Sequence, residues 1–126
     1  MGDVREMKRV LIVDDASFMR MTISMMLKKN DFEIVGEAEN GIEGVRKYKE
    51  LKPDIVTMDI TMPEMSGIEA LREIRAFDPG ANVIMITAMG QEALVREAVM
   101  YGAKSFLVKP FKEEHLINIL KKLLGN

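Results

Sequence analysis

Four short apolar runs of the chain each end in residues that can handle a phosphate group or a cation. The runs and the residues that end them are Val10–Val13 with Asp14 and Asp15, Ile55–Met58 with Asp59, Val83–Ile86 with Thr87, and Phe106–Val108 with Lys109. If the runs are parallel strands of one sheet, their carboxyl ends meet along one edge. That edge then carries three carboxylates, one hydroxyl and one ammonium group. No common structural requirement explains why a charged or hydroxyl side chain follows each of these four strands, so we interpret these side chains as parts of one site.

The three aspartates of this edge predict a binding site for a divalent cation. Ionised carboxylates within a few ångströms repel one another, and either protons or a cation relieves the repulsion. Oxygen ligands with room for water suit Mg²⁺ better than zinc or copper. Asp14 or Asp15 alone could cap the following helix, but two adjacent aspartates exceed that need. We therefore expect Asp14, Asp15 and Asp59 to hold Mg²⁺.

Asp59 is also a candidate nucleophile. As an ordinary turn residue it would only lead the chain into the next loop, whereas as a nucleophile its carboxylate accepts a phosphoryl group to form an acyl phosphate. The cation and Lys109 would offset the charge of the phosphoryl oxygens. Thr87 and backbone N–H groups of the loops after the third and fourth strands would donate the remaining hydrogen bonds to the phosphoryl oxygens. Taken singly, Lys109 fits a surface lysine and Thr87 a plain strand end, but together they suffice for phosphoryl transfer.

The elements that must position these groups alternate along the chain. Strands are predicted at Val10–Val13, Ile34–Ala38, Ile55–Met58, Val83–Ile86 and Ser105–Val108, and helices at Ser17–Lys29, Ile42–Leu51, Gly67–Phe77, Glu92–Tyr101 and Glu113–Leu124. This alternation favours an α/β fold with a doubly wound, five-stranded parallel sheet of the flavodoxin-like (βα)5 kind. A strand order of 2-1-3-4-5, which the family resemblance given below implies, would place Asp14, Asp15 and Asp59 in the crevice between the first and third strands. The second strand is the more polar one and is placed at an edge, while the other four read as runs buried on both faces.

Apolar stripes at helical spacing support the helices. They are Phe18, Met21 and Met25 in the first helix, Ile42, Val45, Tyr48 and Leu51 in the second, and Leu116, Ile119, Leu120, Leu123 and Leu124 in the last. His115 falls on the polar side of the last helix. The twelve methionines are interpreted chiefly as adaptable core filler, with a pliable binding surface as the alternative.

The composition is that of one globular domain, which we expect to span residues 1–126 with an ordered core of about 8–124. Eighteen basic and twenty acidic residues give a net charge of −2, which offers no electrostatic reason to expect nucleic acid or a membrane as partner. Cysteine is absent and His115 is the single histidine, which excludes thiol chemistry and multi-histidine metal sites. Met1–Arg9 has no apolar core and is not a secretory signal, so a cytoplasmic location is expected.

The motif Met58-Asp59-Ile60-Thr61-Met62-Pro63, together with Asp14-Asp15, Thr87-Ala88 and Lys109-Pro110, resembles the receiver domain of two-component response regulators. The resemblance covers nearly the whole chain, and Met89-Gly90-Gln91 is similar to some stand-alone chemotaxis regulators. It implies that Asp59 is the phosphoacceptor. Asp15 would bind Mg²⁺ directly, Asp14 through water, and the backbone carbonyl of Thr61 would be a further ligand.

The same resemblance implies a switch. Thr87 would be the switch hydroxyl, the backbone of Ala88 would contact the phosphoryl group, and Lys109–Pro110 would be a cis bond. Phe106 stands at the position of a rotating aromatic that is tyrosine in many chemotaxis regulators, so its switch would act by burial and space filling only. The alternative interpretation of Phe106 is a plain core residue of its strand.

As a family member the chain would be a signalling phosphoacceptor of chemotaxis with self-catalysed phosphotransfer and slow self-dephosphorylation, rather than an enzyme. Its implied partners are a histidine kinase, a flagellar-motor switch protein that governs flagellar rotation, and a phosphatase, with the chain itself a monomer. Two rivals stay open at this point. One is a Mg²⁺-dependent phosphatase similar to the haloacid dehalogenases, although Thr61 stands where those enzymes place a second acid. The other is a flavodoxin-like carrier of FMN, although Asp14 and Asp15 would repel its phosphate.

Overall fold

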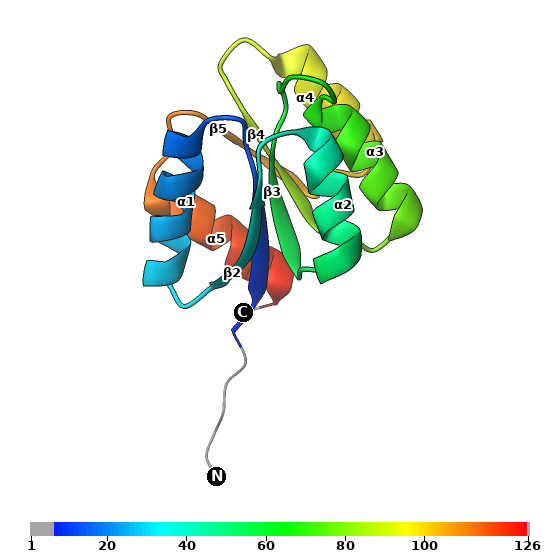
Figure 1. Cartoon of the computed structure of the whole chain (residues 1–126). Helices are drawn as coiled ribbons and strands as arrows, with labels where there is room; N and C mark the ends of the chain where they lie inside the picture. Colours follow the sequence, from blue (N-terminus) through cyan, green and yellow to red (C-terminus); the bar gives the residue numbers. More distant parts are fainter. Residues whose placement is uncertain (1–6, 126) are drawn as a thin grey trace.

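Five helices and five strands alternate along residues 7–125, the part of the chain that this computed structural model describes (Figure 1). The elements are β1 Arg9–Val13, α1 Ser17–Lys29, β2 Glu33–Ala38, α2 Gly41–Leu51, β3 Ile55–Asp59, α3 Gly67–Phe77, β4 Val83–Thr87, α4 Glu92–Met100, β5 Ser105–Val108 and α5 Glu113–Leu124. Each predicted element is present, with bounds that differ from the prediction by at most one residue. The prediction that Met1–Arg9 is not a secretory signal concerns mostly residues outside the described part.

All five strands pair in parallel in the order β2-β1-β3-β4-β5, which confirms the predicted doubly wound sheet. From β1 the chain first winds to β2 at one edge and then returns to β3 on the other side of β1. The winding therefore reverses between β1 and β3, where ligands of such sheets bind outside the carboxyl ends of the strands. Val13 of β1 is in register with Met58 of β3, so the residues that follow them are brought side by side.

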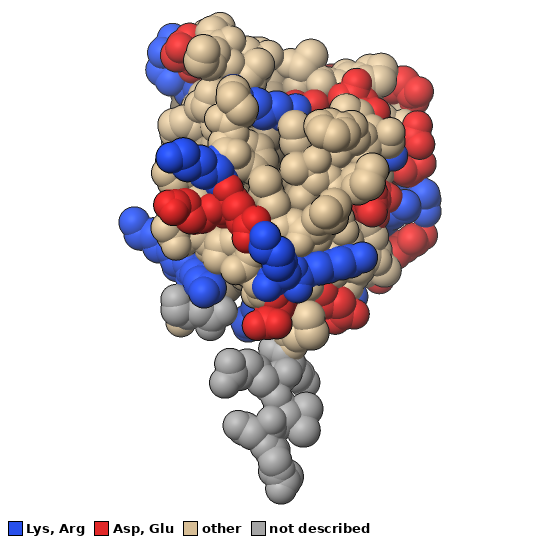
Figure 2. Space-filling view, turned by 90° about the vertical axis from the view of Figure 1, so that its left-hand side faces the viewer, with Lys and Arg blue, Asp and Glu red and all other residues tan. Residues whose placement is uncertain are grey.

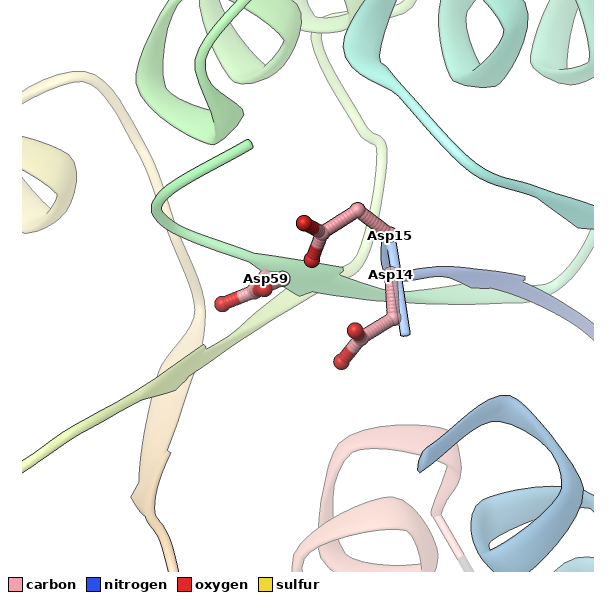
Figure 3. Close-up of side chains that lie close together, drawn as sticks. All are labelled: Asp14, Asp15 and Asp59. Carbon is pink, nitrogen blue, oxygen red and sulfur yellow. The ribbon is translucent and has the colours of Figure 1, made fainter. Parts of the chain in front are cut away.

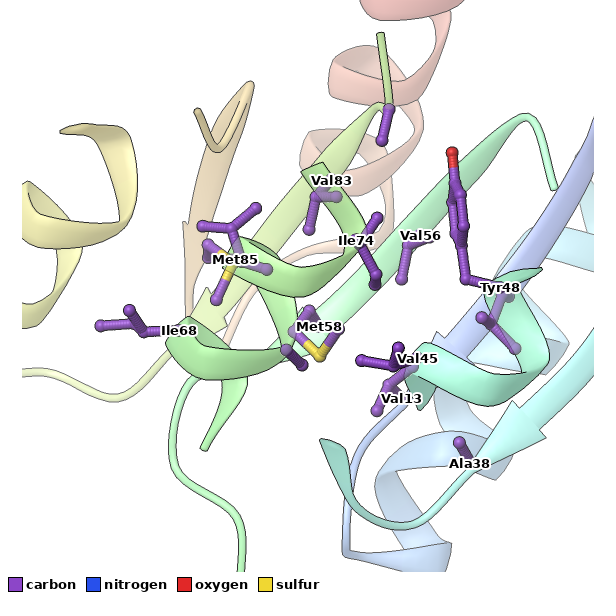
Figure 4. Packing of buried hydrophobic residues seen from close by; sticks show 14 of the residues in the cluster. Val13, Ala38, Val45, Tyr48, Val56, Met58, Ile68, Ile74, Val83 and Met85 are labelled. Atoms are coloured by element: carbon purple, nitrogen blue, oxygen red, sulfur yellow. The ribbon is translucent and has the colours of Figure 1, made fainter. Parts of the chain in front are cut away.

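Helices cover both faces of the sheet, which explains why the central strands are apolar along their whole length. One buried cluster lies beneath α2, α3 and α4 and takes up Leu11 and Val13 of β1 and Met58 of β3 (Figure 4). The other lies beneath α1 and α5 and takes up the alternate residues Val10 and Ile12. Because the two clusters pack on opposite faces of the same strands, the ends of β1, β3 and β4 are held in place from both faces of the sheet.

The two edge strands differ from the expectation in one respect. The polar strand β2 lies at an edge as predicted, but β5 forms the opposite edge and is less buried than its apolar sequence suggests. Phe106 is 45% exposed and Val108 is 37% exposed. The interpretation of Phe106 as a plain core residue is therefore wrong.

The apolar stripe predicted for the first helix faces solvent and not the sheet. Phe18 is 72% exposed and Met21 and Met25 lie on the same outer face, while Ile23 and Leu27 of α1 are buried against the sheet. The helix carries apolar residues on both faces, so spacing alone did not identify the buried one. Ile42 of α2 is likewise exposed, whereas its partners Val45 and Tyr48 are buried and Leu51 is half-buried.

Methionine is core filler at only some positions. Met58, Met62 and Met85 are buried in the core, and the half-buried Met19, Met26 and Met65 pack against it. Met7, Met21, Met25, Met89 and Met100 are exposed, so methionine fills the core at about half of the described positions and lies on the surface at the others. His115 is exposed, as predicted. None of the helices within residues 7–125 is both long and apolar enough to cross a membrane.

Candidate functional site

Three aspartates meet beyond the carboxyl ends of β1 and β3, as the strand-end pattern predicts (Figure 3). One carboxylate oxygen from each of Asp14, Asp15 and Asp59 lies within 4.8 Å of the other two. Asp59 is the last residue of β3 and Asp14 directly follows β1, and both are buried, while Asp15 is exposed. The cluster thus has a buried floor and one acid at its open side.

Asp14 is held by its neighbours rather than acting as a helix cap. Its Oδ1 accepts a hydrogen bond from the backbone N–H of Ala16 at 2.9 Å, and its backbone carbonyl accepts one from Arg20 Nη1 at 2.6 Å. The N-cap residue of α1 is Ala16, and no side chain caps this helix. Capping therefore does not account for Asp14-Asp15, which leaves the cation-binding interpretation.

Lys109 brings a positive charge to the two buried acids. It directly follows β5, and its backbone N–H donates to the carbonyl of Thr87 at 2.7 Å. Its Nζ lies 3.4 Å from Asp14 Oδ2 and 3.8 Å from Asp59 Oδ1. The peptide bond between Lys109 and Pro110 is cis, as expected. One ammonium group facing three carboxylates leaves negative charge at the site.

The electrostatics of Asp59 show that the site is short of positive charge. Burial raises the pKa of Asp59 to about 6, and the negative charges of Asp14 and Asp15 add to the rise, while Lys109 and the backbone N–H of Thr61 oppose it. Three ionised carboxylates are thus unfavourable here unless a cation joins them. An all-oxygen donor set with one side open to water fits Mg²⁺.

The remaining polar groups lie in the loops after β3 and β4, where Gln91 connects them. The hydroxyl of Thr87 donates to Gln91 Oε1 at 2.5 Å, and the backbone N–H of Ala88 donates to the same oxygen at 2.8 Å. Gln91 Nε2 in turn donates to Thr61 Oγ1 at 2.9 Å. Thr87 and Ala88 were predicted to lie at the site from the sequence, but Gln91 was assigned no role, because no motif marks a glutamine that folds back on the loop.

Thr87 and Phe106 line one groove. It has a volume of about 850 Å³, is largely apolar, and runs between the loop after β4, the helix α4 and the strand β5. Gln91 and Met100 lie along the same groove. A change at the hydroxyl of Thr87 is therefore adjacent to the surface on which Phe106 lies.

A comparison with protein families matches residues 10–121 to the response regulator receiver domain. The chain belongs to the response regulator receiver family. It is 59% identical to the chemotaxis protein CheY of Thermotoga maritima over 92% of this chain and 97% of that protein, and 57% identical to CheY of Bacillus subtilis over 93% and 98%. Among solved structures, the CheX–CheY–BeF₃–Mg²⁺ complex of Borrelia burgdorferi matches with a TM-score of 0.89 and 41% identity, over 93% of this chain and 89% of that one.

These likenesses make the chain a chemotaxis response regulator of the CheY type, a signalling receiver and not a catalytic enzyme. The acidic cluster of Asp14, Asp15 and Asp59 is a receiver Mg²⁺ site, and the Borrelia relative was solved with Mg²⁺. The phosphatase and the FMN carrier are thereby set aside as functions of this chain.

Proposed function

We propose that Asp59 accepts a phosphoryl group from the phosphohistidine of a sensor kinase. A P–O bond forms to a carboxylate oxygen of Asp59 while the P–N bond of the donor breaks, and the imidazole nitrogen keeps the electron pair. The observation that supports this role is the position of Asp59, which lies at the end of β3 within reach of both the acidic cluster and the Lys109 ammonium. Asp14 is also buried and lies 3.4 Å from the same ammonium, but Asp59 ends β3, the strand that pairs with β4, and β4 ends at the Thr87 hydroxyl.

The proposed roles of the other residues follow from their donor and acceptor atoms. Asp14, Asp15, Asp59 and the backbone carbonyl of Thr61 would hold Mg²⁺, which supplies positive charge to the phosphoryl oxygens when bound. Lys109, 3.8 Å from Asp59, adds a second positive charge. Because phosphoryl transfer depends mainly on positioning and charge neutralisation, these groups suffice.

Phosphorylation would change the position of the Thr87 hydroxyl first and the packing in the groove next. Thr87 and the backbone N–H of Ala88 would turn to the phosphoryl oxygens, and Phe106 would then change its packing. Both Thr87 and Phe106 line the same groove, which supports a packing switch biased by a local charge. Hydrolysis of the acyl phosphate by water would reset the receiver.

The partners in this proposal are a histidine kinase, a flagellar-motor switch protein and a phosphatase, and the receiver acts as a cytoplasmic monomer through protein contact. The chemotaxis relatives support this assignment, and the Borrelia relative forms a complex with CheX. We further propose that residues 1–126 act as one receiver domain, in line with the family match over residues 10–121.

Labelling with radioactive acetyl phosphate in Mg²⁺ tests the phosphoacceptor. The wild type should take up label, and Asp59→Asn should not. Asp31→Asn is the matched control, because Asp31 is an exposed aspartate with a positive φ of 67° that asparagine also adopts readily. Undiminished labelling of Asp59→Asn would refute the assignment, as would loss of labelling in the control.

A further inference from the structure

The amide of Gln91 occupies the donors that the proposed site offers to a phosphoryl oxygen. Its Oε1 accepts from the hydroxyl of Thr87 and from the backbone N–H of Ala88, at 2.5 and 2.8 Å. Each of these donors carries a single hydrogen. An incoming phosphoryl oxygen can therefore use both of them only after Gln91 Oε1 has left.

The same amide joins two loops of the site. Gln91 belongs to the loop after β4, and its Nε2 donates to Thr61 Oγ1 in the loop after β3 at 2.9 Å. The only other hydrogen-bond acceptor that the Thr87 hydroxyl meets in the described part is the carbonyl of Ala88, at 3.2 Å. The position of the Thr87 hydroxyl is thus set mainly by Gln91.

The backbone between Ala88 and Gln91 turns back on itself at an exposed glycine. Gly90 has a φ of +87°, a conformation that glycine adopts without steric cost and that other residues rarely take. A Cβ added at Gly90 would meet no atom within 4 Å, and Met89 beside it is 75% exposed. This open turn brings Gln91 onto Thr87, and no neighbouring atom fills the space beside Gly90.

We propose that Gln91 is a positioning residue that holds the unphosphorylated state. It acts as an internal competitor of the phosphoryl group for the Thr87 hydroxyl and the Ala88 N–H. The inference rests on the proposed phosphoacceptor role of Asp59. Displacement of Gln91 would break its hydrogen bond to Thr61. It would also let Thr87 turn away from the groove that Gln91 and Phe106 line. Since a ligand shifts a two-state equilibrium only by its differential affinity, the Gln91 bonds reduce the apparent affinity of the site for its anion.

Titration with beryllium fluoride in Mg²⁺, followed by NMR of backbone amides, measures this competition. Beryllium fluoride serves as the phosphoryl analogue. Gln91→Ala removes the competitor and should lower the dissociation constant by about five- to tenfold. Gln91→Glu should raise the dissociation constant, because its carboxylate accepts from the same two donors more strongly and repels the anion. Asn118→Ala removes an exposed amide on α5 that does not line the groove; it is the control and should bind as the wild type does.

Hydrogen exchange of the Ala88 amide, measured without beryllium fluoride, is the second readout. Ala88 is an exposed residue whose N–H is bonded to Gln91, so Gln91→Ala should speed its exchange while amides of β3 and β4 keep their rates. A variant that is merely unfolded would lose protection throughout the sheet. This control separates release of the Gln91 contact from loss of structure.

Two different failures are distinguishable. If the wild type binds no beryllium fluoride in Mg²⁺, the proposed function fails. If the wild type binds it but Gln91→Ala binds equally or more weakly, the competitor role is overturned and the phosphoacceptor role stands. Weaker binding would assign Gln91 to the phosphoryl site itself, with its Nε2 as a donor to the anion.

Discussion

The surroundings of Asp59 disfavour the charge of its carboxylate. The residue is 8% exposed, and burial and the charge of Asp14 raise its pKa to about 6. A residue kept only for stability would not be an acid at such a place, because burying a charge next to like charges is costly. Binding of a cation to the cluster would offset this unfavourable charge.

Replacing Asp59 by asparagine should stabilise the metal-free protein. Because the folded-state pKa of Asp59 is raised, the ionised carboxyl destabilises the fold above about pH 6, and this penalty fades as the pH falls toward the unfolded-state value near 4. In EDTA at about pH 7.5, Asp59→Asn should raise the free energy of unfolding by about 1–3 kcal/mol. Urea titrations at both ends of this pH window measure the gain, which should shrink at the acidic end. A loss of stability at neutral pH, or a gain independent of pH, would contradict the account.

Lys109 is expected to serve the reaction rather than the fold. Lys109→Met keeps the apolar stem and removes the ammonium, so the rate of labelling from acetyl phosphate in Mg²⁺ should fall at least about tenfold. Lys112→Met alters an exposed lysine three residues further on and should label at the wild-type rate. Equal rates for both variants would remove Lys109 from the site.

At the scale of elements, α3 approaches the end of β3 so closely that its first residue has to be glycine. A Cβ built on Gly67 would lie 2.0 Å from the carbonyl oxygen of Asp59, and the N–H of Gly67 donates to the carbonyl of Ile60 at 2.8 Å. The helix begins there with a capping box between Ser66 and Glu69. The start of α3 thus lies directly against the backbone of Asp59, the proposed phosphoacceptor.

Gly67→Ala should therefore lower the free energy of unfolding by about 2–4 kcal/mol, because a backbone group cannot move aside as a side chain does. The matched control is Gly80→Ala, whose added Cβ would meet only Asp78 Oδ1 at 3.6 Å, an ordinary contact. Urea unfolding of both variants decides the point. Similar losses in the two variants would show that the close approach at Gly67 has no energetic consequence.

The helices and strands also show which features of the site can be predicted from a sequence and which cannot. The positions of Asp14, Asp59 and Lys109 were predictable because strand ends meet wherever parallel strands pair, whatever the detailed packing. The direction of the Thr87 hydroxyl was not predictable, because it is set by a glutamine four residues later that returns through a turn at Gly90. A rotamer fixed by a loop contact leaves no periodic signal in the chain.

The errors in predicting which faces of α1 and β5 are buried have a related cause. Helix α1 has apolar residues on both of its sides, and only contact with the sheet selects Ile23 and Leu27 for burial. The strand β5 is apolar but lies at the edge, so Phe106 is left partly exposed. Periodicity predicts that a face is apolar, whereas its burial depends on which neighbour covers it.

For the molecule as a whole, the surface suits contact with proteins. The face shown in Figure 2 carries both signs of charge side by side, with uncharged side chains between them. Exposed apolar side chains gather on α1, at Phe18, Met21 and Met25, and around the groove that Phe106 lines. Exposed apolar groups gathered in this way are typical of interaction surfaces, which fits the proposal that this receiver acts through protein contact.

Magnesium should stabilise the whole fold, because it binds the assembled cluster and not the unfolded chain. At about a hundredfold excess over its dissociation constant, Mg²⁺ should raise the free energy of unfolding by about 2–3 kcal/mol. Asp15→Asn should lose most of this gain, since Asp15 is the exposed acid of the cluster, while Asp31→Asn should keep it. Unfolding in Mg²⁺ and in NaCl of matched ionic strength measures the effect. An equal response of both variants would show that the gain does not come from the acidic cluster.

The most direct test of the central claim is to trap the acyl phosphate and map it. The receiver is treated with acetyl phosphate, with Mg²⁺ or with EDTA, and then reduced with borohydride, which converts an aspartyl phosphate to homoserine that peptide mass spectrometry locates. We predict homoserine at position 59 alone, and only in the sample that contained Mg²⁺. Homoserine at another aspartate, or the same yield at position 59 in EDTA, would contradict the account.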